Sequence, residues 1–200
     1  MSDLPTFVEL GFRHILNFAA LDHILFLLAL AAVYRREDWR DALWAVSAFT
    51  LGHSITLALA VTGALVLPTP VIEFLIPMTI LVTGLENIAV RSRASGLWHG
   101  RYRAGFTAIF GLVHGAGFAN YLRSLFVGSI AGPLFGFNLG IELGQLVVLG
   151  GAAIVLAGID RLFAVPGRGF ATAAYRWRVV SVSALVVLVA ARMAMERRPW

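Results

Sequence analysis

Six long, mainly apolar segments fill almost the whole of this chain. A helix needs about 20 mainly apolar residues to cross the hydrocarbon layer of a bilayer, and each segment reaches that length. We place the segments at residues 7–34, 41–67, 71–90, 103–127, 133–163 and 177–195. The short connections leave no room for a soluble domain. The sequence therefore predicts an all-α, polytopic membrane protein, with residues 1–200 forming one bundle of six transmembrane helices.

The composition agrees with a membrane protein and narrows its chemistry. Hydrophobic residues make up 59% of the 200 residues and charged residues only 14%, which is not the composition of an ordinary soluble domain. The sequence contains no cysteine, which excludes disulfides, thiolate metal sites and cysteine nucleophiles. Any metal site must therefore use nitrogen and oxygen ligands.

The basic residues indicate how the chain is oriented in the membrane. They are all arginines and gather in alternate connections, at residues 35–40, 91–103 and 161–178. The positive-inside rule places these connections in the cytoplasm and the N-terminus outside. Arg192, Arg197 and Arg198 depart from this pattern, because six spans put the C-terminus outside as well. Because the arginines do not form a single patch, we expect no nucleic-acid partner; the expected partner is the lipid bilayer.

Ionisable residues also occur inside the apolar segments. Asp22 and His23 are adjacent in the first segment, and His53, His114 and Glu142 lie in the middle third of later ones. An ionisable group at mid-bilayer costs a few kcal/mol, so such groups usually face the bundle interior, a partner or a water-filled path. We therefore expect these five side chains to meet in one layer.

This layer has the ligands of a transition-metal site. Three imidazoles and two carboxylates without sulfur suit a divalent ion such as nickel, cobalt, zinc or iron. The candidate ligands are His23, His53, His114, Asp22 and Glu142. Adjacent residues of a helix diverge by about 100°, so we prefer His23 over Asp22 as the ligand. Asp22 could instead orient an imidazole, and a third reading is that the histidines only form hydrogen bonds between helices.

Other polar residues of the spans are expected to support this site or to line a path to it. They are His14, Ser54, Glu86, Asn87, Asn138 and Gln145. His14 lies about 13 Å from His23 along a straight helix and on its opposite side. It can share an ion with His23 only if the helix is broken near Asn17.

The fifth segment has two different sides. One side has a glycine at every fourth position, at Gly132, Gly136, Gly140 and Gly144. Such a ridge of small residues allows close helix packing, and the polar residues of this segment lie roughly opposite. We expect this helix to be central in the bundle. Glycine-rich helix faces also allow a homo-oligomer.

Several blocks of sequence carry a family resemblance. They are GFRHIL at 11–16 with DHILFLLAL at 22–30, FTLGHSITL at 49–57, FGLVHGAGFA at 110–119 and FNLGIELGQ at 137–145. Together they resemble the HupE/UreJ family of bacterial membrane proteins, which is associated with nickel supply to hydrogenase and urease. Its members are described as nickel or cobalt permeases. The resemblance implies a multi-pass protein of the bacterial inner membrane, with a transition-metal role for His23, His53, His114 and their acidic neighbours.

Two functions follow from this combination of residues and resemblance. In the favoured one, the chain is a permease or facilitator for a divalent metal ion such as nickel, cobalt or zinc, and Glu86, His14 and Glu73 are steps beside the central site. Transport needs weak or multiple sites so that the ion can leave. The alternative is an intramembrane metal-dependent enzyme, hydrolase-like, in which a His/Asp/Glu-bound metal activates water.

Overall fold

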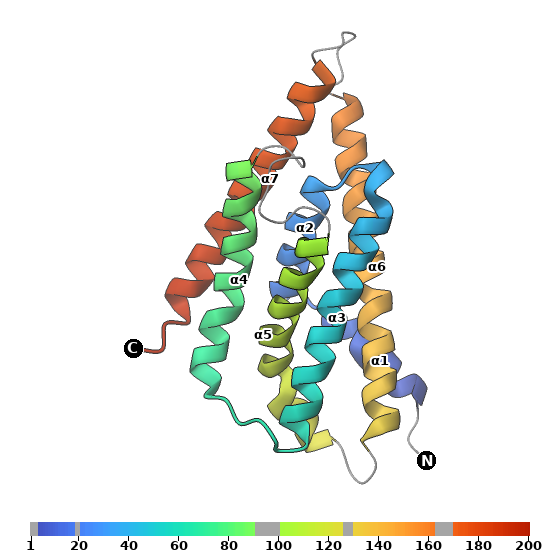
Figure 1. Ribbon diagram of the computed structural model, residues 1–200, viewed down its shortest axis with the longest axis vertical. Coiled ribbons are helices and arrows are strands. Elements are labelled where there is room, and N and C mark those ends of the chain that lie inside the picture. The colour runs from blue at the N-terminus through green and yellow to red at the C-terminus, as the bar shows by residue number, and fades with distance from the viewer. Residues whose placement is uncertain (1–3, 19–20, 91–100, 126–129, 163–169) are drawn as a thin grey trace.

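The structure, a computed structural model, describes residues 4–18, 21–90, 101–125, 130–162 and 170–200. These residues form seven α-helices and one short 3₁₀ helix, with no strand among them (Figure 1). The helices are α1 (Leu4–Ile15), α2 (Asp22–Val33), η1 (Arg36–Asp38), α3 (Trp39–Val61), α4 (Thr69–Val90), α5 (Arg101–Leu125), α6 (Ala131–Leu162) and α7 (Phe170–Glu196). The prediction of an all-helical fold is confirmed.

The first apolar segment forms two helices, and the expected single helix over residues 7–34 is wrong. The chain leaves the helical conformation after Ile15 and resumes it at Asp22. Each half has 12 residues, or about 18 Å of helix, which is shorter than a hydrocarbon core of about 30 Å. The described residues thus contain seven helices, and the predicted count of six is not confirmed.

Four described helices are long and apolar enough to cross a membrane alone. They are Trp39–Val61, Thr69–Ala89, Ala131–Leu162 and Ala173–Glu196, which correspond to four of the predicted spans. The predicted span at 103–127 corresponds to α5, which has 25 residues but is less apolar. Residues 126–127 and 163 of the predicted spans, and most of the basic connection at 91–103, lie outside the described residues.

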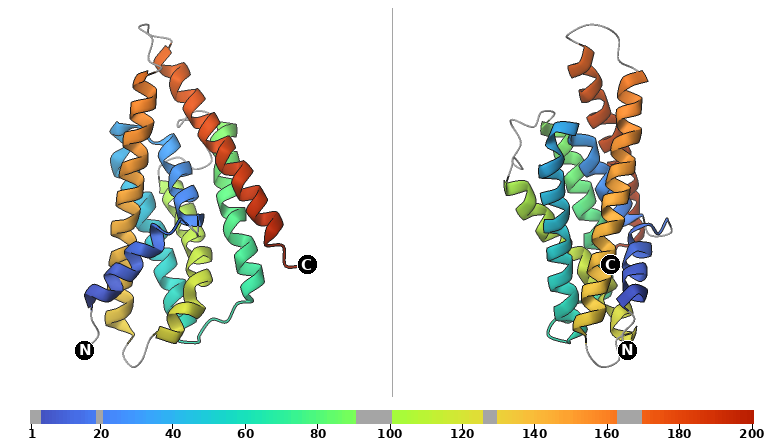
Figure 2. Two further views of the ribbon diagram at one scale, coloured as in Figure 1. Left: turned by 180° about the vertical axis from the view of Figure 1, so that it is seen from behind. Right: turned by 90° about the vertical axis from the view of Figure 1, so that its right-hand side faces the viewer.

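The helices pass alternately between two ends of the molecule. The C-terminal ends of α2, α4 and α6 lie at one end, and those of α3 and α5 lie at the other (Figure 1). The helices α1 and α2 follow one another in the same general direction and together replace one straight span (Figure 2). The arginine-rich connections predicted from the sequence therefore follow helices that end on the same side.

The helices pack mainly in pairs around α2. α1 packs against α6, α3 against α5, and α4 against α7, while α2 contacts α4, α6 and α7. Most residues of α2 are buried, and they occur on all sides of the helix, as expected of a helix that is apolar all round. α2 is therefore the helix around which the bundle closes.

The helix α6 lies between α1 and α3, as its two-sided sequence predicts. A Cβ added at Gly140, or at the glycine four residues before or after it, would collide with α1. On another side, the Ser47 hydroxyl of α3 donates a hydrogen bond to Glu142 at 2.5 Å, and the Thr50 hydroxyl donates one to Gln145 at 2.7 Å. The predicted packing of α6 on two sides is confirmed, and the glycine ridge is used for packing within the chain. The helix is nevertheless not central in the bundle, because side chains such as Val147 and Ile154 on its remaining side are exposed.

Candidate metal centre

The break between α1 and α2 brings two histidines together. His14 lies in the last turn of α1, and His23 is the second residue of α2. Their ring centroids are 4.7 Å apart, whereas a straight helix would hold them on opposite sides and about 13 Å apart. The sequence allowed His14 beside His23 only if the helix were broken near Asn17, and the structure has that break.

Close packing of α3 against α5 positions the other two histidines of the spans. A Cβ at Gly111 would overlap the carbonyl of Phe49, and a Cβ at Gly115 would overlap the carbonyl of His53. Only residues without a side chain let two helix backbones approach in this way. His53 on α3 and His114 on α5 are therefore held at a backbone-to-backbone contact.

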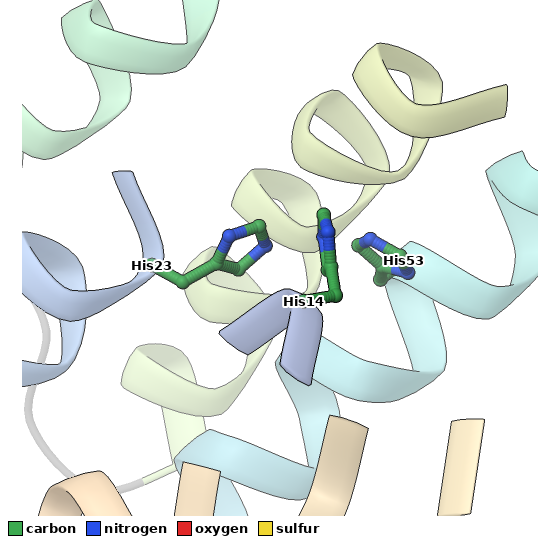
Figure 3. Close-up of side chains that lie close together, drawn as sticks. All are labelled: His14, His23 and His53. Atoms are coloured by element: carbon green, nitrogen blue, oxygen red, sulfur yellow. The ribbon is translucent and has the colours of Figure 1, made fainter. Parts of the chain in front are cut away.

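His14, His23 and His53 form a cluster of three imidazoles. One ring nitrogen of each residue is placed to act as a ligand, and these three nitrogens all lie within 4.8 Å of one another. The ring of His53 is 6.1 Å from that of His14 and 6.0 Å from that of His23. The three side chains converge from different helices, α1, α2 and α3 (Figure 3). We refer to them as the three-histidine cluster.

Most ring nitrogens of the three-histidine cluster have no hydrogen-bond partner among the described residues. These buried atoms are Nε2 of His14, Nε2 of His23, and both Nδ1 and Nε2 of His53. A buried polar atom without a partner costs about 1–3 kcal/mol, so a cluster of them calls for an explanation. A cation bound between the three rings would supply a partner to one nitrogen of each.

The cluster fits a divalent transition-metal ion in its chemistry, with a small adjustment in distance. Imidazole nitrogen is a common ligand for zinc, nickel and cobalt. Two nitrogens bound to one tetrahedral ion, each about 2.0–2.1 Å from it, lie about 3.3 Å apart. The nitrogens here lie within 4.8 Å of one another, so a pair at that limit would have to close by about 1.5 Å around an ion.

His114 lies beside the three-histidine cluster rather than in it. Its ring centroid is 5.2 Å from that of His23, and its Nε2 is 3.1 Å from the Thr79 hydroxyl of α4. Its Nδ1 is buried and has no hydrogen-bond partner in the described part of the chain. The structure therefore places His114 next to the predicted ligands His23 and His53, with one nitrogen already occupied by a neighbouring helix.

The two predicted carboxylate ligands are engaged elsewhere. Asp22 forms an ion pair with Arg197 of the C-terminal segment, at 3.2 Å. Glu142 accepts the hydrogen bond from Ser47 described above. Among the described residues, the group able to hold an ion consists of three histidines and no acid. The arrangement thus offers nitrogen ligands without negative charge.

Aromatic rings surround the cluster, and sequence reasoning did not single them out. The ring of Phe118 lies 4.0 Å from that of His14 and stacks on Phe137, and Phe49 packs beside His23 at 5.9 Å. Phe49 and Phe137 are fully buried, so they keep water away from the imidazoles. All three occur in the same sequence blocks as His53, His114 or Glu142, which is the signal that could have identified them.

The remaining predicted residues lie near the cluster or on the far side of His114. Ser54 donates a hydrogen bond to the Thr50 carbonyl of its own helix, and the buried Oδ1 of Asn138 has no partner among the described residues. Glu86 lines a small cavity of about 20 Å³ together with Arg103. That volume suffices for about one water molecule.

Asn87 joins three helices next to this small cavity. Its amide donates hydrogen bonds to the Ala29 carbonyl of α2 and to the Ser183 hydroxyl of α7. Its amide oxygen accepts one from Arg103 of α5 at 3.1 Å. Asn87 is therefore part of the packing between helices and does not contact the three-histidine cluster.

Comparison with known proteins gives one match. The family model described as HupE / UreJ protein matches residues 1–197 of the chain. Comparison with curated proteins and with solved structures gave no match. The matched range includes all seven described helices and all three histidines of the cluster.

Proposed function

Because the chain belongs to the HupE/UreJ family, we propose that this multi-pass membrane protein is a permease or facilitator for a divalent metal ion of the nickel or cobalt type. His14, His23 and His53 bind the ion within the membrane. The observation that carries this proposal is the buried three-histidine cluster. One nitrogen of each ring lies within 4.8 Å of the other two, and most of the ring nitrogens have no hydrogen-bond partner among the residues that the structure describes.

The break between α1 and α2 supports ion binding at this point. The C-terminal end of a helix carries a partial negative charge from its free carbonyl groups, and α1 ends at Ile15, next to His14. Ion sites of many transporters lie at interrupted transmembrane helices, where such half-helix ends face the cation. The end of α1 therefore supplies partial negative charge to a site whose three side chains are neutral.

Release of the ion is supported by the loose spacing of the cluster and by its neighbour. The nitrogens must move together to hold an ion, so the bound state is not fully preorganised. His114 lies beside His23 and offers the unpartnered Nδ1 as a next contact. Conduction requires sites that are weak or multiple enough for the ion to leave. In this proposal the ion passes from the three-histidine cluster towards α4 and α5.

Orientation and location are part of the same proposal. We place the N-terminus outside and the chain in the bacterial inner membrane, as the positive-inside rule and the family suggest. The C-terminal ends of α2, α4 and α6, where the arginine-rich connections begin, lie at one end of the molecule (Figure 1). That end faces the cytoplasm.

The function is tested with the purified chain in liposomes that contain a metal-sensitive dye. Addition of nickel or cobalt outside should give uptake that depends on the protein. His14→Ala, His23→Ala and His53→Ala should each lower the uptake rate at least roughly tenfold, since even the loss of a hydrogen-bond partner of a metal ligand costs ten- to a hundredfold in affinity or activity. Thr56→Val, which changes another buried residue of α3, is the control and should keep wild-type uptake.

Metal content separates transport from the alternative function. Elemental mass spectrometry of the purified chain should show metal that is taken up on titration and lost on dialysis. Metal that stays bound at one per chain, with no uptake into liposomes, would instead favour an intramembrane metal-dependent hydrolase. Three imidazoles with an open fourth position are also the ligand set of catalytic zinc. No metal bound under any condition would refute both functions.

A further inference from the structure

A large groove runs along the outer side of α6, away from the three-histidine cluster. It has a volume of about 670 Å³ and is lined by residues of α2, α3, α6 and α7. Its walls are mainly apolar, with Leu43, Leu146, Leu149 and Ile154 among them. Ligand sites for small molecules commonly have volumes of about 300–1,000 Å³, so the groove is large enough for part of a lipid.

Small residues of α6 form the floor of this groove. Gly150, Ala153, Ala157 and Gly158 line it. A Cβ added at Gly150 or Gly158 would meet no described atom within 4 Å. These glycines therefore differ from Gly140, which is packed against α1. The groove is hollow because the residues of its floor have either a methyl group or no side chain.

Arginine side chains mark one end of the groove. Arg35, Arg161 and Arg178 line it, together with Tyr34 and Trp39, and its lining contains no acidic residue. Arg178 is neutralised by an ion pair with Asp160. Arg35 stacks over the Tyr175 ring at 4.2 Å and lies 3.8 Å from the exposed Glu37.

Arg161 is exposed and forms no ion pair with any described residue. This end of the groove therefore has a positive charge that no acidic residue in the described part of the chain balances.

The length of the groove matches one leaflet of a bilayer. Leu146 directly follows Gln145 in α6 and lies near the layer of ionisable residues that the sequence places at mid-bilayer. Arg161 lies at the C-terminal end of the same helix. These two residues are about 22 Å apart along the helix axis. A bilayer with its head groups is about 40–45 Å thick, so one leaflet is about 20–22 Å. Apolar walls thus face the acyl chains, and the arginines lie at the level of the head groups.

We propose that this groove binds one phospholipid with a negatively charged head group. Its acyl chains lie along Leu146, Gly150 and Ile154, and its phosphate contacts Arg35 and Arg161. Basic pockets between helices at a membrane surface recognise anionic head groups in this way. A second copy of the chain fits less well, since it would bring the same arginines towards each other.

The proposal is tested by native mass spectrometry of the full-length chain in detergent. The chain is titrated with phosphatidylglycerol or with phosphatidylcholine of the same acyl chains. Phosphatidylglycerol should bind at least tenfold more tightly. Arg161→Gln and Arg35→Gln should each reduce this preference about fivefold, as expected of one arginine near an anionic surface. Arg192→Gln, an exposed arginine outside the groove, should leave the preference unchanged.

Filling the groove gives a second test that does not depend on charge. Gly150→Leu and Gly158→Leu place a side chain into the hollow and should abolish binding of the lipid. Gly151→Leu is the matched control, because Gly151 also faces open space but does not line the groove. This variant should bind lipid like the wild type.

Three results would overturn the proposal. The first is equal binding of the two lipids by the wild type. The second is retention of the lipid by both Gly150→Leu and Gly158→Leu. The third is a wild-type dimer that carries no lipid and becomes monomeric in Gly158→Leu, since the groove would then be covered by a second copy. None of these results depends on whether the chain carries metal.

Discussion

Gly140→Ala tests whether the packing of α1 on α6 holds His14 in the three-histidine cluster. The added Cβ would overlap the carbonyl oxygen of Val8 and lie 2.8 Å from the Phe12 nitrogen, where an ordinary contact is 3.4–4 Å. The overlap with the Val8 oxygen is the larger of the two, so the backbone of α1 must move away from α6 by more than about 1 Å to restore an ordinary contact. His14 follows Phe12 by two residues in the same helix and must move with it.

The expected effect can be estimated from these distances. Overpacking a tight contact typically costs about 1–3 kcal/mol, and part of this appears as a lower free energy of unfolding. The ligand nitrogens lie within 4.8 Å of one another, and a pair at that limit must already approach by about 1.5 Å to bind one ion. A further retreat of His14 should weaken nickel binding by about tenfold, which is about 1.4 kcal/mol at 25 °C.

Nickel affinity and thermal unfolding of the purified chain should be measured together. Gly150→Ala is the matched control on the same helix, because a Cβ there meets nothing within 4 Å. It should bind nickel like the wild type and gain up to about 1 kcal/mol in stability from the better helix former. The reasoning is refuted if Gly140→Ala is folded and binds nickel as tightly as Gly150→Ala.

Three further predictions concern the residues around the cluster. His114→Ala should weaken nickel binding by no more than about threefold, whereas His14→Ala should weaken it by at least tenfold, as measured by isothermal titration. The reverse order would favour His114 over His14 as a ligand, as the sequence predicted. Asp22→Asn and Arg197→Gln should each destabilise the chain by about 1 kcal/mol, because the pair is only partly buried, and full additivity in the double variant would exclude their coupling. Asn87→Ala should cost about 1–3 kcal/mol in thermal or denaturant unfolding, because it leaves buried groups of three helices without partners; an unchanged midpoint would contradict this.

The sequence was sufficient for the helical fold and for the layer of histidines. Length and hydropathy predicted helices at residues 41–67, 71–90 and 133–163, and α3, α4 and α6 occupy most of these ranges, although α3 already ends at Val61. Periodicity predicted that α6 packs on two sides. These features could be predicted because they depend on the local spacing of apolar, polar and small residues. That spacing decides which faces of a helix pack.

The break between α1 and α2 could not be predicted in the same way. The described residues of the connection are Leu16, Asn17, Phe18 and Leu21, and the sequence there contains neither proline nor glycine. Nothing local marks a helix end except Asn17. Tertiary packing overrides helix propensity at such a point. The candidate ligands predicted from the sequence therefore included His114 and not His14, whereas the group of nitrogens within 4.8 Å of one another contains His14.

The carboxylates show a second limit of the sequence. The sequence predicted Asp22 and Glu142 as ligands, but the partners that they have in the structure, Arg197 and Ser47, are distant in the sequence. The pair with Arg197 also accounts for one arginine that departs from the positive-inside pattern. This arginine balances an acid within the bundle and is not a free charge at the surface.

The separation of acids from imidazoles has a consequence for the proposed transport. A divalent ion held by three neutral imidazoles keeps its double charge in a medium of low dielectric constant, where an unbalanced charge is costly. The C-terminal end of α1 offers partial compensation close to His14. A carboxylate ligand would neutralise the ion and hold it more firmly. The lack of a carboxylate among the ligands therefore lowers the cost of releasing the ion and favours passage; because three imidazoles alone also hold catalytic zinc, exchange of the bound metal is the measurement that separates passage from permanent binding.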